Sequence, residues 1–185
     1  MPVSLPNAIT IARILLVPFT VWLIINHQFG FALFAFLMAG ISDAVDGLIA
    51  RRYNLQSELG AYLDPIADKA LLVSIYVALA AMQFLPTWLA IIVVTRDVLI
   101  VGAVLLAWVL ARPVEMRPLQ VSKVNTVAQI LFAGALLFTL ATQLPLDGIL
   151  DVGELLVAML TLASGAIYMR NWVRHMSTPA GGKTP

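Results

Sequence analysis

The sequence predicts an all-α integral membrane protein with six transmembrane helices. Hydrophobic residues make up 61% of the 185 residues and charged residues only 11%, against about 25% charged residues in an ordinary soluble domain. The mean hydropathy is +0.95. A helix that crosses a membrane needs about 20 mostly apolar residues, and six such stretches follow one another along the chain. Little of the chain remains for a soluble domain.

The six apolar stretches are separated by residues that favour turns. The stretches cover approximately residues 7–26, 30–50, 60–82, 86–110, 119–142 and 151–171. The breaks between them fall at Asn26–Gly30, Arg51–Ser57, Pro86, Arg112–Pro118 and Pro145–Gly148. Glycine, proline and small polar residues at these places end helices. We therefore expect one membrane domain over residues 1–176 and a disordered tail over residues 177–185.

The basic residues predict the orientation of the helices, because lysine and arginine accumulate in cytoplasmic loops. With a cytoplasmic N-terminus, nine of them lie at inner ends of helices: Arg51, Arg52, Lys69, Arg112, Arg117, Lys123, Arg170, Arg174 and Lys183. The expected outer loops contain no lysine or arginine. Both termini are therefore expected in the cytoplasm, with the basic side facing anionic lipid headgroups.

Four aspartates lie where the second and third helices approach the cytoplasm. They belong to the pattern D-x2-D-G-x2-A-R-x8-G-x3-D-x3-D, which runs from Asp43 to Asp68. Asp43 and Asp46 are three residues apart and Asp64 and Asp68 four apart, so each pair shares one face of a helix. A charged residue at the centre of a spanning helix disfavours insertion by roughly 2.5–3.5 kcal/mol. Such residues therefore indicate a functional site.

Divalent cations are the counter-charge that this pattern favours. Carboxylate oxygens are preferred ligands of Mg²⁺ and Mn²⁺, and two ions about 3.5–4 Å apart stabilise both oxygens of a phosphoryl displacement. Gly47, Ala50 and Gly60 leave room beside the acids, and Arg51 suits phosphate oxygens. Structural alternatives remain for single residues, since Asp64 before Pro65 is also a typical helix start. The pattern as a whole favours a pocket for a metal-bound diphosphate.

The pattern resembles the signature of the CDP-alcohol phosphatidyltransferases at every specified position. The resemblance implies a six-helix homodimer that transfers a phosphatidyl group from CDP-diacylglycerol to an alcohol and releases CMP. It implies that Asp43, Asp46 and Asp64 bind two divalent ions, Mg²⁺ or Mn²⁺, and that Asp68 joins the metal site and acts as the general base. The residues that it places around the CDP moiety are Gly47, Ala50, Arg51 and Gly60.

Asn7, Thr10 and Arg13 on the first helix also resemble a recurrent feature of the family near the nucleotide. Each has a structural alternative: Asn7 is a good N-cap, and the Arg13 side chain can extend to the membrane surface. They are weaker candidates for binding CDP than the residues of the aspartate pattern.

Two polar segments bear on the acceptor alcohol. Arg96-Asp97-Val98 lies within the fourth helix, and Ser122-Lys123-Val124-Asn125-Thr126 opens the fifth. These strings look like the cardiolipin synthase (CMP-forming) branch, which uses phosphatidylglycerol as acceptor. We expect Arg96, Lys123 and, more weakly, Asn125 to bind the acceptor phosphate. The alternatives are an ion pair of Arg96 with Asp97 within the membrane and a Lys123 side chain that extends to the headgroups.

The branch that produces phosphatidylglycerol phosphate from glycerol 3-phosphate is the main alternative. It usually has Arg-Glu at the first string and a lysine where Asn125 stands, which suits the more highly charged acceptor. A more distant alternative is a non-catalytic membrane protein that binds lipids, and no nucleic-acid partner is expected. The family resemblance, together with the orientation, places the enzyme in a bacterial cytoplasmic membrane with its active site facing the cytoplasm.

Overall fold

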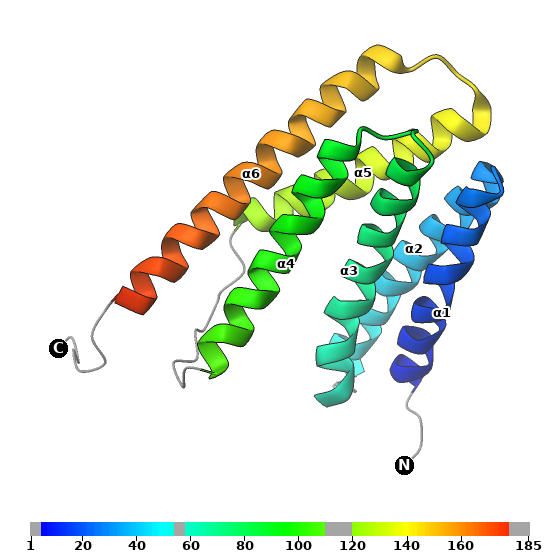
Figure 1. Ribbon diagram of the computed structural model, residues 1–185. Coiled ribbons are helices and arrows are strands. Elements are labelled where there is room, and N and C mark those ends of the chain that lie inside the picture. The colour runs from blue at the N-terminus through cyan, green and yellow to red at the C-terminus, as the bar shows by residue number, and fades with distance from the viewer. Residues whose placement is uncertain (1–4, 54–57, 110–119, 178–185) are drawn as a thin grey trace.

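The computed structural model describes the backbone of residues 5–53, 58–109 and 120–177 and, within these, the side chains of residues 14–42, 69–103, 106 and 120–174. These ranges contain six helices (Figure 1). The helices are α1 Leu5–Ile25, α2 Phe29–Tyr53, α3 Glu58–Ala81, α4 Thr87–Val109, α5 Gln120–Thr142 and α6 Asp147–Ser177. The described residues contain no strand, so the predicted all-α class is confirmed for them.

The helix bounds agree with the apolar stretches to within a few residues, with two informative differences. The second helix continues through the polar residues Arg51 and Arg52 to Tyr53, where the sequence predicts a break. The sixth helix starts at Asp147 and extends to Ser177, so it reaches the first residue of the expected tail. Intrahelical hydrogen bonding thus extends beyond the apolar residues at both places. Residues 178–185 of the expected tail lie outside the described part.

Three helices end on the same side of the bundle, and each is followed by a residue in the left-handed backbone conformation. His27, Gln83 and Gln143 follow α1, α3 and α5 and have φ angles of 57°, 63° and 56°. After α1, the Gln28 amide donates to the Leu23 carbonyl oxygen at 2.9 Å, which closes the helix end as a left-handed C-terminal residue normally does. The connections α1–α2, α3–α4 and α5–α6 therefore turn back at one end of the bundle (Figure 1).

The packing order differs from the order along the chain. The first helix packs against α2 and α3, α5 packs against α2 and α6, and α4 packs against α6 and α3. In the part of the chain that is described, α2 and α3 have no direct packing contact, and α1 contacts both. The largest side chains buried at the centre include Tyr76, Ile75, Leu79, Leu89 and Leu137.

Large apolar side chains also cover the outside of the bundle. Phe31, Leu131, Ile149 and Val152 are each exposed by 66–68%. An exposed apolar surface of this extent marks a contact with membrane or protein. Within the described residues, Gln120–Thr142 of α5 and Asp147–Arg174 of α6 are long and apolar enough to cross a membrane. These two helices are candidate spans.

Candidate active site

The backbone places all four aspartates of the pattern at one end of the bundle. Asp43 and Asp46 lie on α2, and Asp64 and Asp68 lie on α3. Asp46 is about two helical turns before the end of α2, and Asp64 is nearly two turns after the start of α3. The two pairs are therefore at the same depth along their helices. Both segments are helical, as the spacing of each pair requires.

The residues of the pattern fit a divalent metal site by their chemistry. Four carboxylates on two helices provide hard oxygen ligands without competing nitrogen or sulfur donors, and the chain has no cysteine. Among the side chains that the structure describes, no other group of three His, Cys, Asp or Glu residues lies together. The side chains of the predicted metal and CDP residues lie outside the described set: Asp43, Asp46, Asp64, Asp68, Gly47, Ala50, Arg51, Gly60, Asn7, Thr10 and Arg13.

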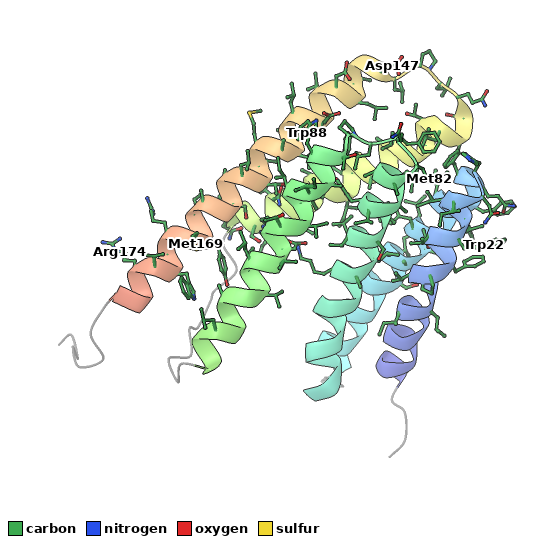
Figure 2. All side chains as sticks on the ribbon, in the orientation of Figure 1. Trp22, Met82, Trp88, Asp147, Met169 and Arg174 are labelled. Atoms are coloured by element: carbon green, nitrogen blue, oxygen red, sulfur yellow. The ribbon has the colours of Figure 1, made fainter. Side chains whose placement is uncertain are left out.

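A second polar group, whose side chains are described, surrounds Arg96 of α4. The guanidinium Nη2 donates to the hydroxyl oxygens of Ser122 on α5 at 2.5 Å and Ser164 on α6 at 2.7 Å. Its Nη1 donates to Asp97 Oδ1 at 2.6 Å. Only 5% of Arg96 is exposed. The expected ion pair with Asp97 is therefore present, and the same guanidinium also links α5 and α6 to α4. Figure 2 draws these helices with their described side chains.

Asp97 also binds a cation from another helix. Lys69 Nζ on α3 lies 2.8 Å from both carboxylate oxygens of Asp97. Asp97 is buried, whereas the Lys69 side chain is 37% exposed. One carboxylate thus pairs with two cations, and the three charged residues hold α3 against α4. We call Lys69, Arg96 and Asp97 the charged triad.

Asn125, the weaker acceptor candidate, lies in a neutral polar network between α5 and α6. The Thr161 hydroxyl donates to Asn125 Oδ1 at 2.9 Å and accepts from Gln129 Nε2 at 3.2 Å. The Tyr76 hydroxyl on α3 donates to the Gln129 carbonyl oxygen at 3.1 Å. Asn125, Gln129 and Thr161 are fully buried. These side chains therefore form a buried polar network that joins α3, α5 and α6.

Four buried polar atoms among the described side chains, three of them in these two groups, have no hydrogen-bond partner in the structure. They are Arg96 Nε, Asn125 Nδ2, Gln129 Oε1 and the Tyr168 hydroxyl oxygen. Buried polar groups normally find a partner in protein or water. Arg96 Nε and Asn125 Nδ2 are donors, so the structure leaves two donors available to a ligand or to ordered water at this site. Lys123, by contrast, is exposed at the start of α5, next to Ser122.

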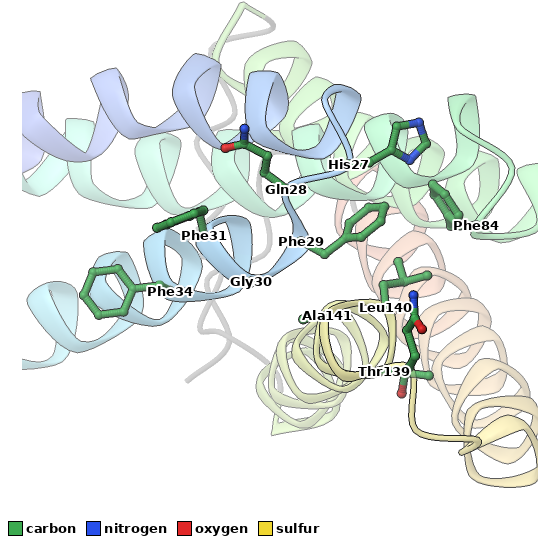
Figure 3. A pocket seen from close by; sticks show the side chains of 11 residues that line it. His27, Gln28, Phe29, Gly30, Phe31, Phe34, Phe84, Thr139, Leu140 and Ala141 are labelled. Carbon is green, nitrogen blue, oxygen red and sulfur yellow. The ribbon is translucent and has the colours of Figure 1, made fainter.

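A cavity lies at the opposite end of the bundle from the aspartates. It has a volume of about 1220 Å³ and is lined by residues of the α1–α2 connection and of α2, with Phe84 and the end of α5 (Figure 3). His27, Phe29 and Phe84 form an edge-to-face aromatic cluster beside it, with ring centroids 5.1–5.8 Å apart. Neither the aspartate pattern nor the charged triad contributes to this cavity. Its size therefore does not identify the site of chemistry.

Comparison with known proteins identifies the family. Residues 3–173 match the CDP-alcohol phosphatidyltransferase family, which covers nearly the whole chain. The chain belongs to this family. The matched range of the CDP-alcohol phosphatidyltransferase includes the aspartate pattern, the charged triad and the neutral network, so all three are parts of the family domain.

The relatives of this chain carry names of two kinds. The human cardiolipin synthase (CMP-forming) is 35% identical over 150 residues, which cover 72% of this chain and 50% of that protein. A cardiolipin synthase (CMP-forming) / mitochondrial hydrolase fusion protein of Schizosaccharomyces pombe is 35% identical over 192 residues, with 94% of this chain and 32% of that protein covered.

A chloroplastic relative from rice is named for a different enzyme of the same family. The CDP-diacylglycerol--glycerol-3-phosphate 3-phosphatidyltransferase 1 of Oryza sativa subsp. japonica is 33% identical over 188 residues, covering 89% of this chain and 56% of that protein. The chain thus spans from about a third to just over half of the length of these relatives.

Sequence reasoning overlooked two residues of the site. Lys69 is noticed in the sequence only as a basic residue near the cytoplasm, and Ser164 is not singled out at all. Lys69 pairs with a residue 28 positions away and Ser164 with one 68 positions away. A single sequence contains no signal for contacts over such separations. The position of Lys69 directly after Asp68 is the one local feature that links it to the site.

Proposed function

We propose that the protein transfers a phosphatidyl group from CDP-diacylglycerol to the hydroxyl group of phosphatidylglycerol, giving cardiolipin and CMP. The single observation that carries the proposal is the aspartate pattern, divided between two helices at the same depth within a family domain. The cardiolipin synthase relatives support phosphatidylglycerol as the acceptor.

In the proposed site, Asp43, Asp46, Asp64 and Asp68 hold two divalent cations, Mg²⁺ or Mn²⁺. When bound, these ions supply positive charge next to the diphosphate and so favour departure of CMP. Gly47, Ala50 and Gly60 leave space for the CDP moiety, and Arg51 binds its phosphate oxygens. Asn7, Thr10 and Arg13 on α1 are additional CDP candidates, supported by the packing of α1 against both α2 and α3.

Asp68 accepts the proton of the acceptor hydroxyl in this proposal. The hydroxyl oxygen then forms a bond to the phosphatidyl phosphorus, and the bond from that phosphorus to the CMP oxygen breaks. Positioning and charge stabilisation dominate a phosphoryl transfer, so an aspartate can serve as the base. Arg96, Lys123 and Asn125 bind the acceptor phosphate, supported by the unpartnered donors Arg96 Nε and Asn125 Nδ2.

We further propose that all six helices cross a membrane, with both termini and the aspartates on the cytoplasmic side. The exposed apolar side chains and the turns at one end of the bundle support this arrangement. The homodimer, the contact with anionic lipids and the location in a bacterial cytoplasmic membrane belong to the same proposal. Residues 1–176 form its membrane domain.

The deciding experiment measures CMP release by the purified protein in detergent or liposomes with CDP-diacylglycerol and Mg²⁺ or Mn²⁺. Phosphatidylglycerol and glycerol 3-phosphate are offered in parallel. Turnover with phosphatidylglycerol alone supports cardiolipin synthesis. Turnover with glycerol 3-phosphate alone would instead make the protein a phosphatidylglycerol phosphate synthase, the second candidate, which the rice relative favours. Absence of CMP with either acceptor would leave another alcohol or a non-catalytic lipid-binding role.

A further inference from the structure

Two hollows meet at the start of α2, at the end of the bundle opposite the aspartates. The cavity of about 1220 Å³ lies between the first turns of α2 and the last turn of α5, and we call it the α2–α5 cavity. A smaller hollow of about 300 Å³ lies between the second half of α1 and the first turns of α2, and we call it the α1–α2 groove. Gln28, Phe31 and Phe34 line both of them. The two hollows are therefore neighbours at the start of α2.

The walls of both hollows are apolar and carry no formal charge. Apart from Gln28, every residue that lines the α1–α2 groove is apolar. Phe29 and Phe84 belong to the apolar wall of the α2–α5 cavity (Figure 3). Among the described residues, no lysine, arginine, aspartate or glutamate lines either hollow. Deeper in the bundle α2 and α5 come together, because a β-carbon on Gly134 would lie 3.7 Å from Phe36 Cε1. The α2–α5 cavity is thus confined to this end of the bundle.

Most of the polar groups of the α2–α5 cavity lie in the connections between helices. His27 and Gln28 belong to the α1–α2 connection, and Gln143 directly follows α5. The side chains of Gln28 and Gln143 are exposed and make no hydrogen bond within the described part of the chain. Each side-chain amide has two N–H donors and one carbonyl acceptor. The rim of the cavity can therefore donate to the oxygen atoms of an ester or a phosphodiester.

Both hollows open onto the apolar outer surface of the bundle. Phe31 and Phe34, which separate them, are 68% and 64% exposed. In the proposed membrane arrangement this surface faces lipid. An empty hollow there would deprive its walls of dispersion contacts, and water needs polar partners that these walls lack. Acyl chains are the material at this depth that fills such a space.

We propose that this end of the protein binds one diacyl phospholipid of the membrane, with one acyl chain in the α2–α5 cavity and the other in the α1–α2 groove. The glycerol-ester region of the lipid crosses the start of α2 at Gly30, which lines the cavity and has nothing within 4 Å of a β-carbon. Its ester oxygens accept from the amides of Gln28 and Gln143. The site lies far from the aspartates, so this lipid is a structural ligand and no substrate.

The proposed site recognises the shape of the lipid and its ester oxygens rather than the charge of its headgroup. Apolar surfaces gain little by leaving a lipid environment for a protein one, so packing and hydrogen bonds provide the preference within a membrane. Two hollows that share one polar residue, Gln28, match two chains that share one glycerol. The inference depends on the proposed membrane arrangement and is independent of the proposed reaction.

Gly30 provides the variant that tests the site. Delipidated protein in detergent is heated with phosphatidylcholine, a diacyl lipid whose headgroup has no hydroxyl to act as an acceptor. A ligand that binds the folded state raises the melting temperature, so phosphatidylcholine should raise that of the wild type. Gly30→Trp should lose most of this rise, because the indole occupies the place where the lipid crosses α2. Native mass spectrometry should show one bound phosphatidylcholine fewer for this variant.

The matched control is Gly40→Trp on the same helix. Gly40 is exposed, has nothing within 4 Å of a β-carbon and lines neither hollow. This variant should keep the rise in melting temperature and the bound lipid. Lysophosphatidylcholine, which has one acyl chain, fills only one hollow and should raise the melting temperature of the wild type less than phosphatidylcholine does.

Either of two results would overturn the inference. One is a folded Gly30→Trp protein, as judged by gel filtration, that binds phosphatidylcholine as the wild type does. The other is an equal rise in melting temperature with the one-chain and the two-chain lipid. If Gly30→Trp fails to fold, Ala141→Trp fills the α2–α5 cavity from α5 and must give the same loss. These measurements need no CMP release, so a failure of the proposed function leaves them unaffected.

Discussion

Asp97 of α4 holds Lys69 of α3 with both carboxylate oxygens, each 2.8 Å from the ammonium nitrogen. Lys69 directly follows Asp68, the proposed general base. The ion pair therefore restrains the rotation of α3 about its axis immediately beside the aspartate pattern. Since Asp97 also accepts from Arg96, the proposed acceptor site and the proposed catalytic helix share one carboxylate.

Replacement of the proposed base should remove activity without unfolding the protein. We expect Asp68→Asn to lower the rate of CMP release by at least about 100-fold, the lower range for loss of general base catalysis. The matched control is Asp147→Asn, because Asp147 is exposed at the start of α6, at the opposite end of the bundle. Steady-state CMP release measures both variants. An Asp68→Asn protein with near wild-type turnover would exclude the assigned role.

Removal of divalent ions should abolish CMP release reversibly. EDTA is expected to stop turnover, and an excess of Mg²⁺ or Mn²⁺ should restore it. Ions that bind the folded state raise the melting temperature, so Mg²⁺ should stabilise the wild-type protein in a thermal scan. Asp43→Asn combined with Asp46→Asn should lose that stabilisation. Undiminished turnover in EDTA after extensive dialysis would contradict the metal assignment.

Loss of Arg96 should destabilise the bundle, because its guanidinium joins α4 to α5 and α6. Arg96→Leu is expected to lower the free energy of unfolding by about 3 kcal/mol; the cost is at the lower end because Asp97 retains Lys69. Arg170 is exposed on α6, so Arg170→Ala should stay within about 0.5 kcal/mol of the wild type. Chemical denaturation in detergent measures both, and equal stabilities of the two variants would contradict the structural role of Arg96.

Replacement by alanine should change the stability of the protein differently at two glycines. A β-carbon on Gly153 of α6 would lie 2.8 Å from Phe132 Cδ2 of α5, and Phe132 is itself buried. Gly153→Ala should therefore lower stability by about 1–3 kcal/mol. Gly102 of α4 has nothing within 4 Å of a β-carbon, so Gly102→Ala should be neutral or stabilise by up to about 1 kcal/mol. Thermal scans of the two variants provide the comparison, and similar losses in both would contradict the packing of α5 on α6.

The proposed topology predicts which positions are accessible from outside the cell. Because the chain has no cysteine, single cysteines can be placed without background. Gln83→Cys and Gln143→Cys, in the α3–α4 and α5–α6 connections, should react with a membrane-impermeant maleimide in intact cells. Arg170→Cys should react only after the membrane is permeabilised. Labelling of Arg170→Cys in intact cells would place the C-terminal end of α6 on the outer side.

Local sequence predicted most of the helices because each depends on neighbouring residues. Apolar stretches of sufficient length and turn residues such as Pro86 locate four of the six helices closely at both ends. The predicted ends of α2 and α6 were less accurate, since the helical backbone continues through Arg52 and beyond Arg170. Hydrophobicity marks what lies in the membrane and does not mark where a helix stops.

The sequence by itself determined the helical class, the aspartate pattern and the family, because these depend on composition and on short spacings along the chain. Only the tertiary structure decided that Asp97 joins Lys69 to Arg96 and that Arg96 reaches Ser122 and Ser164. Those contacts depend on which face each helix turns toward its neighbours. Packing of all six helices together sets that orientation, and an apolar helix with similar residues on every side does not encode it locally.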